Sequence, residues 1–191
     1  MRNRGLLILF AVFIALAAII FLSDRGTIGG GNQATVPTAV FLRVYPDMAV
    51  LDILAIQLED PVTGQTFAVA RAPDGQWEGV GFSDPLNQEL TSTIAASVVL
   101  LPYTRTIDLP TDGNLSQYGL GARPQFLVSV ITADRQQHIV AVGNPLQSGP
   151  EFYALVDDRE QLYVIQRSPI DYLAGFLSEP PLQVEGASIT P

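Results

Sequence analysis

The stretch that decides the fold is residues 51–70, LDILAIQLEDPVTGQTFAVA. Apolar side chains alternate from Leu51 to Glu59, which predicts a β-strand with apolar residues on both faces. The alternation places Leu51, Ile53 and Ala55 on one face and Leu54, Ile56 and Leu58 on the other. Asp60–Gly64 (DPVTG) has turn chemistry, so Gln65–Ala70 returns as an antiparallel partner strand.

The neighbouring segments extend this hairpin. Val40–Tyr45 reads as a short strand before it, and Gln76–Glu78 follows a Pro-Asp-Gly turn as a third antiparallel strand. A helix then begins with Asp84 as N-cap and Pro85 at the first helical position. Its apolar stripe recurs at about four-residue spacing and comprises Leu86, Leu90, Ile94, Val98 and Leu101, and Pro102 ends the helix.

The second half, from Thr104 to Leu177, contains four further apolar stretches that read as strands. They are Gln125–Ala133, His138–Val142, Glu151–Val156 and Gln161–Gln166. Ser168-Pro169 begins a last short helix, Ile170–Leu177. The expected fold class is therefore α+β, with a mostly antiparallel sheet or sheets, one long and one short helix, and a single N-terminal transmembrane helix before them.

The N-terminal segment has the pattern of a membrane anchor. Gly5–Leu22 (GLLILFAVFIALAAIIFL) contains no charge and spans about 27 Å as a helix, close to the roughly 30 Å hydrocarbon core of a bilayer. Arg2 and Arg4 precede it, so the positive-inside rule places the N-terminus in the cytoplasm and the remainder outside. A cleaved signal peptide is the alternative, but its apolar core is usually shorter, about 7–15 residues.

These patterns divide the chain into four parts. We expect a transmembrane anchor at 1–25, a flexible Gly-rich linker at 26–38, an extracytoplasmic α+β domain at 39–177 and an extended, proline-bearing tail at 178–191. The expected location is the cytoplasmic membrane, crossed once, with the C-terminal domain on the extracytoplasmic side.

Composition excludes several classes of function. The chain has no cysteine and no lysine, so thiol catalysis, Cys-ligated metals, a Walker A loop and a pyridoxal phosphate Schiff base are all excluded. Ten basic residues oppose nineteen acidic ones, and this acidity disfavours nucleic-acid binding. With one histidine, multi-histidine metal sites are also excluded. We therefore expect no catalytic, cofactor-binding or metal-binding residues, and no cofactor.

Four groups of residues could be read as functional sites, but each is better explained by a structural role. His138 begins an alternating stretch and is interpreted as a histidine at a strand edge, because no nucleophile motif accompanies it. Asp157, Asp158 and Glu160 lack calcium-loop spacing and are interpreted as a solvated hairpin turn. Asn114-Leu115-Ser116 is a glycosylation site by pattern only. Tyr153 and Tyr163 lie in predicted strands and are expected to form core or cross-strand pairs.

A family resemblance rests on the order of several short motifs. They are Leu115-Ser116-Gln117-Tyr118-Gly119-Leu120 with Pro124, Val142-Gly143-Asn144, Phe152-Tyr153-Ala154-Leu155 and Leu162-Tyr163-Val164-Ile165, with Trp77 ahead of a long helix. The chain resembles a bacterial family of membrane-anchored extracytoplasmic domains of unknown function, the DUF4340-like family. The resemblance implies a non-enzymatic partner of ABC-type export or gliding-associated membrane systems. Gly119 and Pro124 are expected to be structural, with Gly119 at positive φ.

The expected function is a non-catalytic accessory or scaffolding subunit of a larger membrane complex, either an electron-transfer complex or an ABC-type transport system. Its expected partners are integral membrane subunits, and the lipid bilayer through residues 5–22. The alternative is a stand-alone envelope binding module for a peptide or glycan, which requires a concave pocket with converging polar groups.

Overall fold

The computed structural model describes residues 42–183. The nine strands are β1 Leu42–Arg43, β2 Ile53–Asp60, β3 Gln65–Arg71, β4 Trp77–Gly79, β5 Pro102–Asp108, β6 Phe126–Thr132, β7 Gln137–Pro145, β8 Glu151–Val156 and β9 Gln161–Gln166. The helices are α2 Gln88–Val99 and α3 Arg167–Ser178, with short 3-10 turns η1 at Val50–Asp52 and η2 at Ser116–Tyr118.

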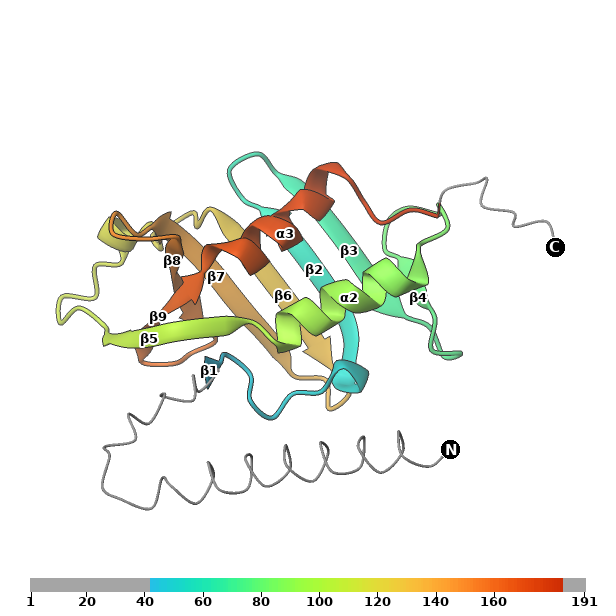
Figure 1. The fold of residues 1–191 in the computed structure, drawn as a ribbon, viewed down its shortest axis with the longest axis horizontal. Helices are drawn as coiled ribbons and strands as arrows, with labels where there is room; N and C mark the ends of the chain where they lie inside the picture. The colour runs from blue at the N-terminus through green and yellow to red at the C-terminus, as the bar shows by residue number, and fades with distance from the viewer. Residues whose placement is uncertain (1–41, 184–191) are drawn as a thin grey trace, which may run out of the picture. The chain divides into compact units, whose positions relative to one another are not determined.

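All nine strands belong to one antiparallel sheet in the order β1-β5-β9-β8-β7-β6-β2-β3-β4. The three-stranded meander predicted around residues 51–78 is confirmed as β2, β3 and β4. Both helices cross the same face of the sheet (Figure 1). Helix α2 carries the chain from β4 at one edge to β5 near the other, and α3 leads back from β9 toward β2 and β3.

The expected fold class is wrong in its arrangement. The two halves of the domain share one continuous sheet, because β2 pairs with β6 along six positions. The helices are equal in length, with 12 residues each, rather than one long and one short. The expected N-terminal transmembrane helix, residues 5–22, lies outside the described residues. Within residues 42–183, the structure contains no helix with the length and apolar character that crossing a bilayer requires.

Helix α2 begins three residues later than the sequence predicted. The N-cap is Asn87, whose Oδ1 accepts a hydrogen bond from the Leu90 backbone N–H at 3.1 Å. Segment 85–87 instead pairs with 181–183 in an extended bridge, with Asn87 donating to the Pro181 carbonyl at 2.7 Å. Part of the predicted tail is therefore bound to the domain, and the remainder, 184–191, lies outside the described residues.

The core lies between the sheet and the two helices. Ile56, Val69 and Val130 point to this side from three neighbouring strands and are at most 1% exposed. The predicted division of residues 51–58 between two faces is confirmed from Ala55 to Leu58 and is wrong before Ala55, because the β2–β6 register shifts between Ile53 and Ala55. This bulge turns Ile53 to the same side as Ile56, and Leu51 lies before the strand, 81% exposed.

On the opposite side of the sheet, the segment before β6 covers one end. Tyr118 packs edge-to-face on Tyr153 at 4.9 Å between ring centroids. Leu120, Leu162 and Val164 are buried there and do not belong to the main core. The predicted positive φ of Gly119 is confirmed at 71°. This covering segment leaves the β2, β3, β6 and β7 part of the same side open.

Candidate functional site

A cavity of about 490 Å³ lies where several loops meet at one end of the sheet. Tyr45 and Met48 come from the loop after β1, and Asp52 from η1. The β6–β7 turn, the start of β7 and the β8–β9 turn contribute Asp134, His138 and Arg159 to the lining. The cavity therefore joins side chains from widely separated parts of the sequence.

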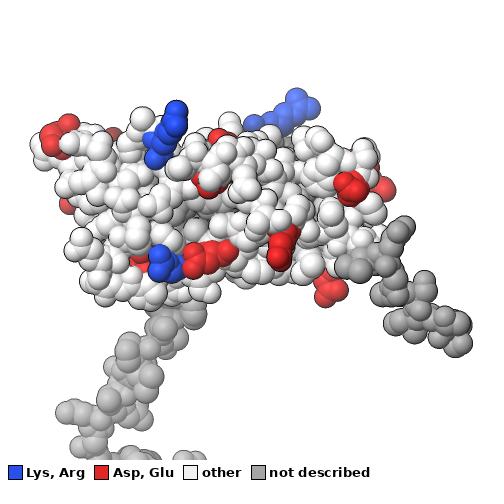
Figure 2. Space-filling model, turned by 90° about the horizontal axis from the view of Figure 1, so that it is seen from above, with Lys and Arg blue, Asp and Glu red and all other residues white. Residues whose placement is uncertain are grey.

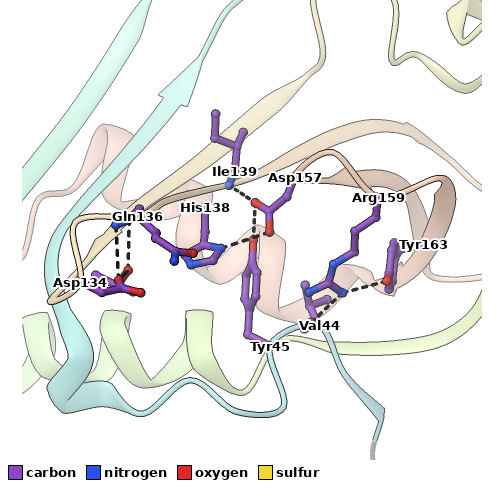
Figure 3. Close-up of polar contacts among 10 residues, drawn as sticks. Val44, Tyr45, Asp134, Gln136, His138, Ile139, Asp157, Arg159 and Tyr163 are labelled. Carbon is purple, nitrogen blue, oxygen red and sulfur yellow. Dashed lines mark hydrogen bonds and ion pairs between the residues drawn. The ribbon is translucent and has the colours of Figure 1, made fainter.

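Asp157 holds one wall of this cavity together. Its carboxylate accepts hydrogen bonds from the Ile139 backbone N–H at 2.7 Å and from the Tyr45 hydroxyl at 3.4 Å (Figure 3). The other carboxylate oxygen lies 3.1 Å from Nδ1 of His138. Asp157 has a left-handed backbone with φ of 48°, which Asp tolerates better than most residues. This turn residue thus positions both Tyr45 and His138.

Tyr45 is buried beside Asp157 and His138, with only 4% of its surface exposed. Its ring meets that of His138 edge-to-face at 5.2 Å between centroids. Burial, and next to it the negative charge of Asp157, raises the pKa of Tyr45 well above its ordinary value. Its hydroxyl is therefore a neutral donor at physiological pH.

Arg159 fills the position on the other side of Tyr45. Its Nη1 donates to the Val44 carbonyl at 3.0 Å and to the Tyr163 hydroxyl at 2.8 Å (Figure 3). The guanidinium carbon lies 5.6 Å from the Tyr45 ring centroid and 5.4 Å from that of Tyr163. Burial alone lowers the pKa of Arg159, but the Tyr163 hydrogen bond and nearby Asp157 outweigh it, so the net change is upward.

Asp134 lies in the turn between β6 and β7. Its Oδ1 accepts from the Thr132 hydroxyl at 2.6 Å and from the Gln136 backbone N–H at 3.3 Å. The Thr132 hydrogen bond is the main cause that holds the pKa of Asp134 below its ordinary value of 3.8, followed by the Gln136 N–H.

This lowered pKa predicts a pH dependence of stability. The stabilising contribution of the Asp134 carboxylate is present above its unfolded pKa of 3.8 and is lost as pH falls through the lower folded pKa. The effect is small because the carboxyl is exposed and screened. Asp134→Asn removes it, so the urea midpoints of wild type and variant should converge as pH falls from about 6 to 2. A constant difference over that range would contradict the assignment.

The side chains of Tyr45, Asp134, His138, Asp157 and Arg159 together have the geometry of a binding site. An Asp behind a His fixes the ring orientation, as in many catalytic dyads, but such chemistry also needs a nucleophile on the other ring nitrogen. Across residues 42–183, no hydroxyl is hydrogen-bonded to Nε2 of His138. The same part of the chain places no three His, Asp or Glu side chains close enough to share a metal ion. Recognition of a polar ligand fits these residues best.

A second feature is the side of the sheet opposite the helices, here called the open face. It comprises the side chains of Ala55, Gln57, Glu59, Thr66, Ala68, Ala70, Glu78, Leu127, Ser129, Ile131, Gln137, Ile139, Ala141 and Leu155. Ile131 and Ile139 are 43% and 37% exposed. A shallow depression of about 330 Å³, lined by Ile139, Ala141 and Leu155 among others, lies on it.

Two of the candidate residues considered from the sequence, His138 and Asp157, lie at the cavity, whereas Tyr163 packs between two strands. His138 lies at the start of β7, as predicted, yet Asp157 and Tyr45 make it part of the cavity wall. The interpretation of 157–160 as a hairpin turn is confirmed, but Asp157 is only partly solvated, because its carboxylate accepts hydrogen bonds from Ile139 and Tyr45 and its side chain is 24% exposed. Tyr163 packs edge-to-face on Tyr103 at 5.0 Å, which confirms its predicted cross-strand role.

Sequence reasoning missed the other residues of the cavity. Tyr45, Asp52 and Arg159 carry no motif, and they are brought together only when β1, η1 and the β8–β9 turn pack. Asn114 of the glycosylation pattern lies in a loop, where its Oδ1 accepts from the Ser116 backbone N–H at 3.0 Å. Asp134 lies between two of the predicted strands, and an Asp in a tight turn is too common to indicate a site.

Neither protein-family models, nor curated proteins, nor solved structures contain a match to this chain. The resemblance to a family of membrane-anchored domains stays a prediction.

Proposed function

We propose that this chain is a non-catalytic interaction subunit that docks, through the open face of its sheet, on integral membrane subunits of a larger complex. The open face is the observation that carries the proposal. An antiparallel sheet with one packed side usually carries polar residues on its other side. Here Leu127, Ile131, Ile139 and several alanines lie among the polar side chains of that side, and such a mixed apolar surface is typical of one that receives a partner.

The charges around the open face favour one kind of partner. Glu59 and Glu78 are its charged side chains on the described strands β2, β3, β4, β6 and β7, which place no Arg there. Figure 2 shows the domain from another side, at 90° to the view of Figure 1, and there too Asp and Glu side chains are more numerous than Arg on a largely uncharged surface. A partner surface with an apolar centre and Arg or Lys at its rim complements this pattern.

Membrane attachment belongs to the same proposal and is supported by the sequence. The uncharged apolar stretch 5–22 attaches the chain to the bilayer, and the linker keeps the domain within reach of membrane neighbours. The partners are then subunits of an ABC-type transport system or of an electron-transfer complex. The domain acts on the extracytoplasmic side.

The test is recovery of the partner subunits from native membranes in mild detergent, with a tag on the C-terminus. We expect stoichiometric transporter or electron-transfer subunits with the wild type. The double variant Ile131→Glu, Ile139→Glu should reduce recovery at least tenfold, because it places two charges in an apolar interface. The urea midpoint should change little, since both side chains are partly exposed.

Two controls make this test specific. Val62→Glu changes an aliphatic residue in the β2–β3 turn that is 67% exposed and lies off the open face, so it should leave recovery intact. Truncation after Gln183 removes residues 184–191 and keeps the bridge between 181–183 and segment 85–87, so it should also leave recovery intact. Recovery of the wild-type protein alone, or undiminished recovery with the double variant, would contradict docking through the open face.

A stand-alone envelope binding module is the second candidate, and the cavity beside His138 is the observation that favours it. Its volume of about 490 Å³ falls in the range of small-ligand pockets. This candidate predicts that the domain binds its ligand with no partner subunit present.

A further inference from the structure

The loop between β5 and η2 carries the one Asn-X-Ser/Thr sequence in the chain, Asn114-Leu115-Ser116. With X other than Pro, this sequence is the acceptor for N-linked glycosylation. None of the other asparagines has Ser or Thr two residues later; they are Asn3, Asn32, Asn87 and Asn144. Neither the open face nor the cavity uses this motif.

The structure places the motif where an enzyme can reach it. Residues 111–114 are four consecutive exposed residues, and Ser116 is exposed as well. Residues 109–115 belong to no strand or helix, and the Gly113 N–H donates within the loop, to the Pro110 carbonyl at 2.9 Å. Because the loop has no hydrogen bonds of the sheet to lose, it can enter the groove of a transferase while the sheet stays intact.

The two groups that define the motif are both available. Oδ1 of Asn114 accepts from the Ser116 backbone N–H at 3.0 Å, and Oδ1 of Asp112 accepts from the Asn114 backbone N–H at 3.0 Å. These turns engage only the side-chain oxygens of Asp112 and Asn114. Nδ2 of Asn114 and the hydroxyl of Ser116 make no hydrogen bond with any residue between 42 and 183.

We propose that Asn114 is an N-linked glycosylation site, whose glycan donor is an oligosaccharide carried on a lipid pyrophosphate. Nδ2 attacks the anomeric carbon of the first sugar, so that a C–N bond forms and the bond from this carbon to the pyrophosphate oxygen breaks. The electron pair leaves with the lipid pyrophosphate, and the Nδ2 proton passes to a base of the transferase. The inference rests on the extracytoplasmic location in the proposed function, because the acceptor sequence is used in exported loops.

A glycan at Asn114 leaves the open face uncovered. The loop after β5 lies at the end of the domain away from β3 and β4 (Figure 1). In the sheet order, β9 and β8 separate β5 from β7, which carries Ile139 of the open face. At about 4.8 Å between neighbouring strands, this separation is about 14 Å. The same chain can therefore carry a glycan and dock through the open face.

The test is the mass of one tryptic peptide from protein purified out of native membranes through a C-terminal tag. Trypsin cleaves after Arg105 and Arg135 but not at Arg123-Pro124, so it releases peptide 106–135, in which Asn114 is the only Asn. We expect most wild-type copies of this peptide to carry a chain of sugar residues, located on Asn114 by fragmentation.

Three variants identify the acceptor. Asn114→Gln and, separately, Ser116→Ala should abolish the added mass, whereas Ser116→Thr should keep it, because Thr supplies the same hydroxyl. The urea midpoints should change little, since both side chains are exposed. An unmodified wild-type peptide, or a glycan that persists in Ser116→Ala, would overturn the proposal.

Thiol labelling separates this inference from the location on which it rests. The chain has no cysteine, so Thr111→Cys introduces a single thiol into the same exposed loop. A maleimide that cannot membranes pass should label this variant in intact cells or spheroplasts. A labelled variant whose peptide 106–135 carries no sugar would contradict glycosylation and leave the docking proposal standing. Labelling only after lysis would contradict the extracytoplasmic location, and the glycosylation site with it.

Discussion

Gly143→Ala should lower the free energy of unfolding by about 3 kcal/mol, at the upper end of the usual cost of overpacking a tight contact. A Cβ at position 143 would collide with the backbone carbonyl oxygen of Tyr118 and lie 3.1 Å from the Gly119 carbonyl carbon. Both atoms belong to the backbone, so no rotamer change relieves the contact. The segment around Tyr118 must move away from β7, and the edge-to-face contact between Tyr118 and Tyr153 is then lost.

Urea unfolding of the variant and of a matched control measures this effect. Gly175→Ala makes the same chemical change in helix α3, where nothing lies within 4 Å of the added carbon. It should stabilise the protein by up to about 1 kcal/mol, the difference between Ala and Gly in helix propensity. If the two variants unfold at the same urea concentration, the close approach of the Tyr118 segment to β7 is wrong.

Asp157→Ala is the second variant with a large expected effect, a loss of about 3 kcal/mol in the free energy of unfolding. It removes the acceptor for the Ile139 N–H, the Tyr45 hydroxyl and Nδ1 of His138 at once. Only 4% of Tyr45 is exposed, so the variant leaves a largely buried hydroxyl without its acceptor. The left-handed backbone at Asp157 adds strain for Ala.

Two comparisons separate these causes. Asp157→Asn keeps an acceptor oxygen and tolerates the φ of 48°, so it should cost clearly less than Asp157→Ala. Asp158→Ala changes the adjacent exposed carboxylate and should stay within about 0.5 kcal/mol of the wild type. Urea midpoints measure all three variants. An Asp157→Ala variant as stable as Asp158→Ala would mean that the carboxylate does not hold Tyr45 and His138.

Local sequence patterns predicted much of the fold correctly. The DPVTG turn between two apolar stretches predicted the β2–β3 hairpin, because turn chemistry and alternation act over a few residues. The four strands β6 to β9 were predicted for the same reason. Strand β5 was missed, because Thr104, Arg105 and Thr106 are exposed and give it no apolar alternation. It becomes a strand through its pairing with β9.

The candidate site was beyond sequence reasoning. Asp157 and Tyr45 are 112 residues apart, and nothing in the sequence relates one to the other. His138 was noted, but without its partners it was indistinguishable from any histidine at the start of a strand. The cavity exists because the loop after β1, η1 and two hairpin turns meet at one end of the sheet, and that meeting depends on the order of the strands.

By itself, the sequence determined the antiparallel hairpins, the approximate positions of α2 and α3, the acidity of the chain, and the absence of cysteine and lysine chemistry. Each of these depends on local spacing or on composition. Only the tertiary structure decided that two halves share one sheet, that a bulge turns Ile53 to the core, and that the carboxylate of Asp157 orients His138 beside a cavity. These features come from pairings between distant strands, whose energies depend on packing in three dimensions rather than on neighbouring residues.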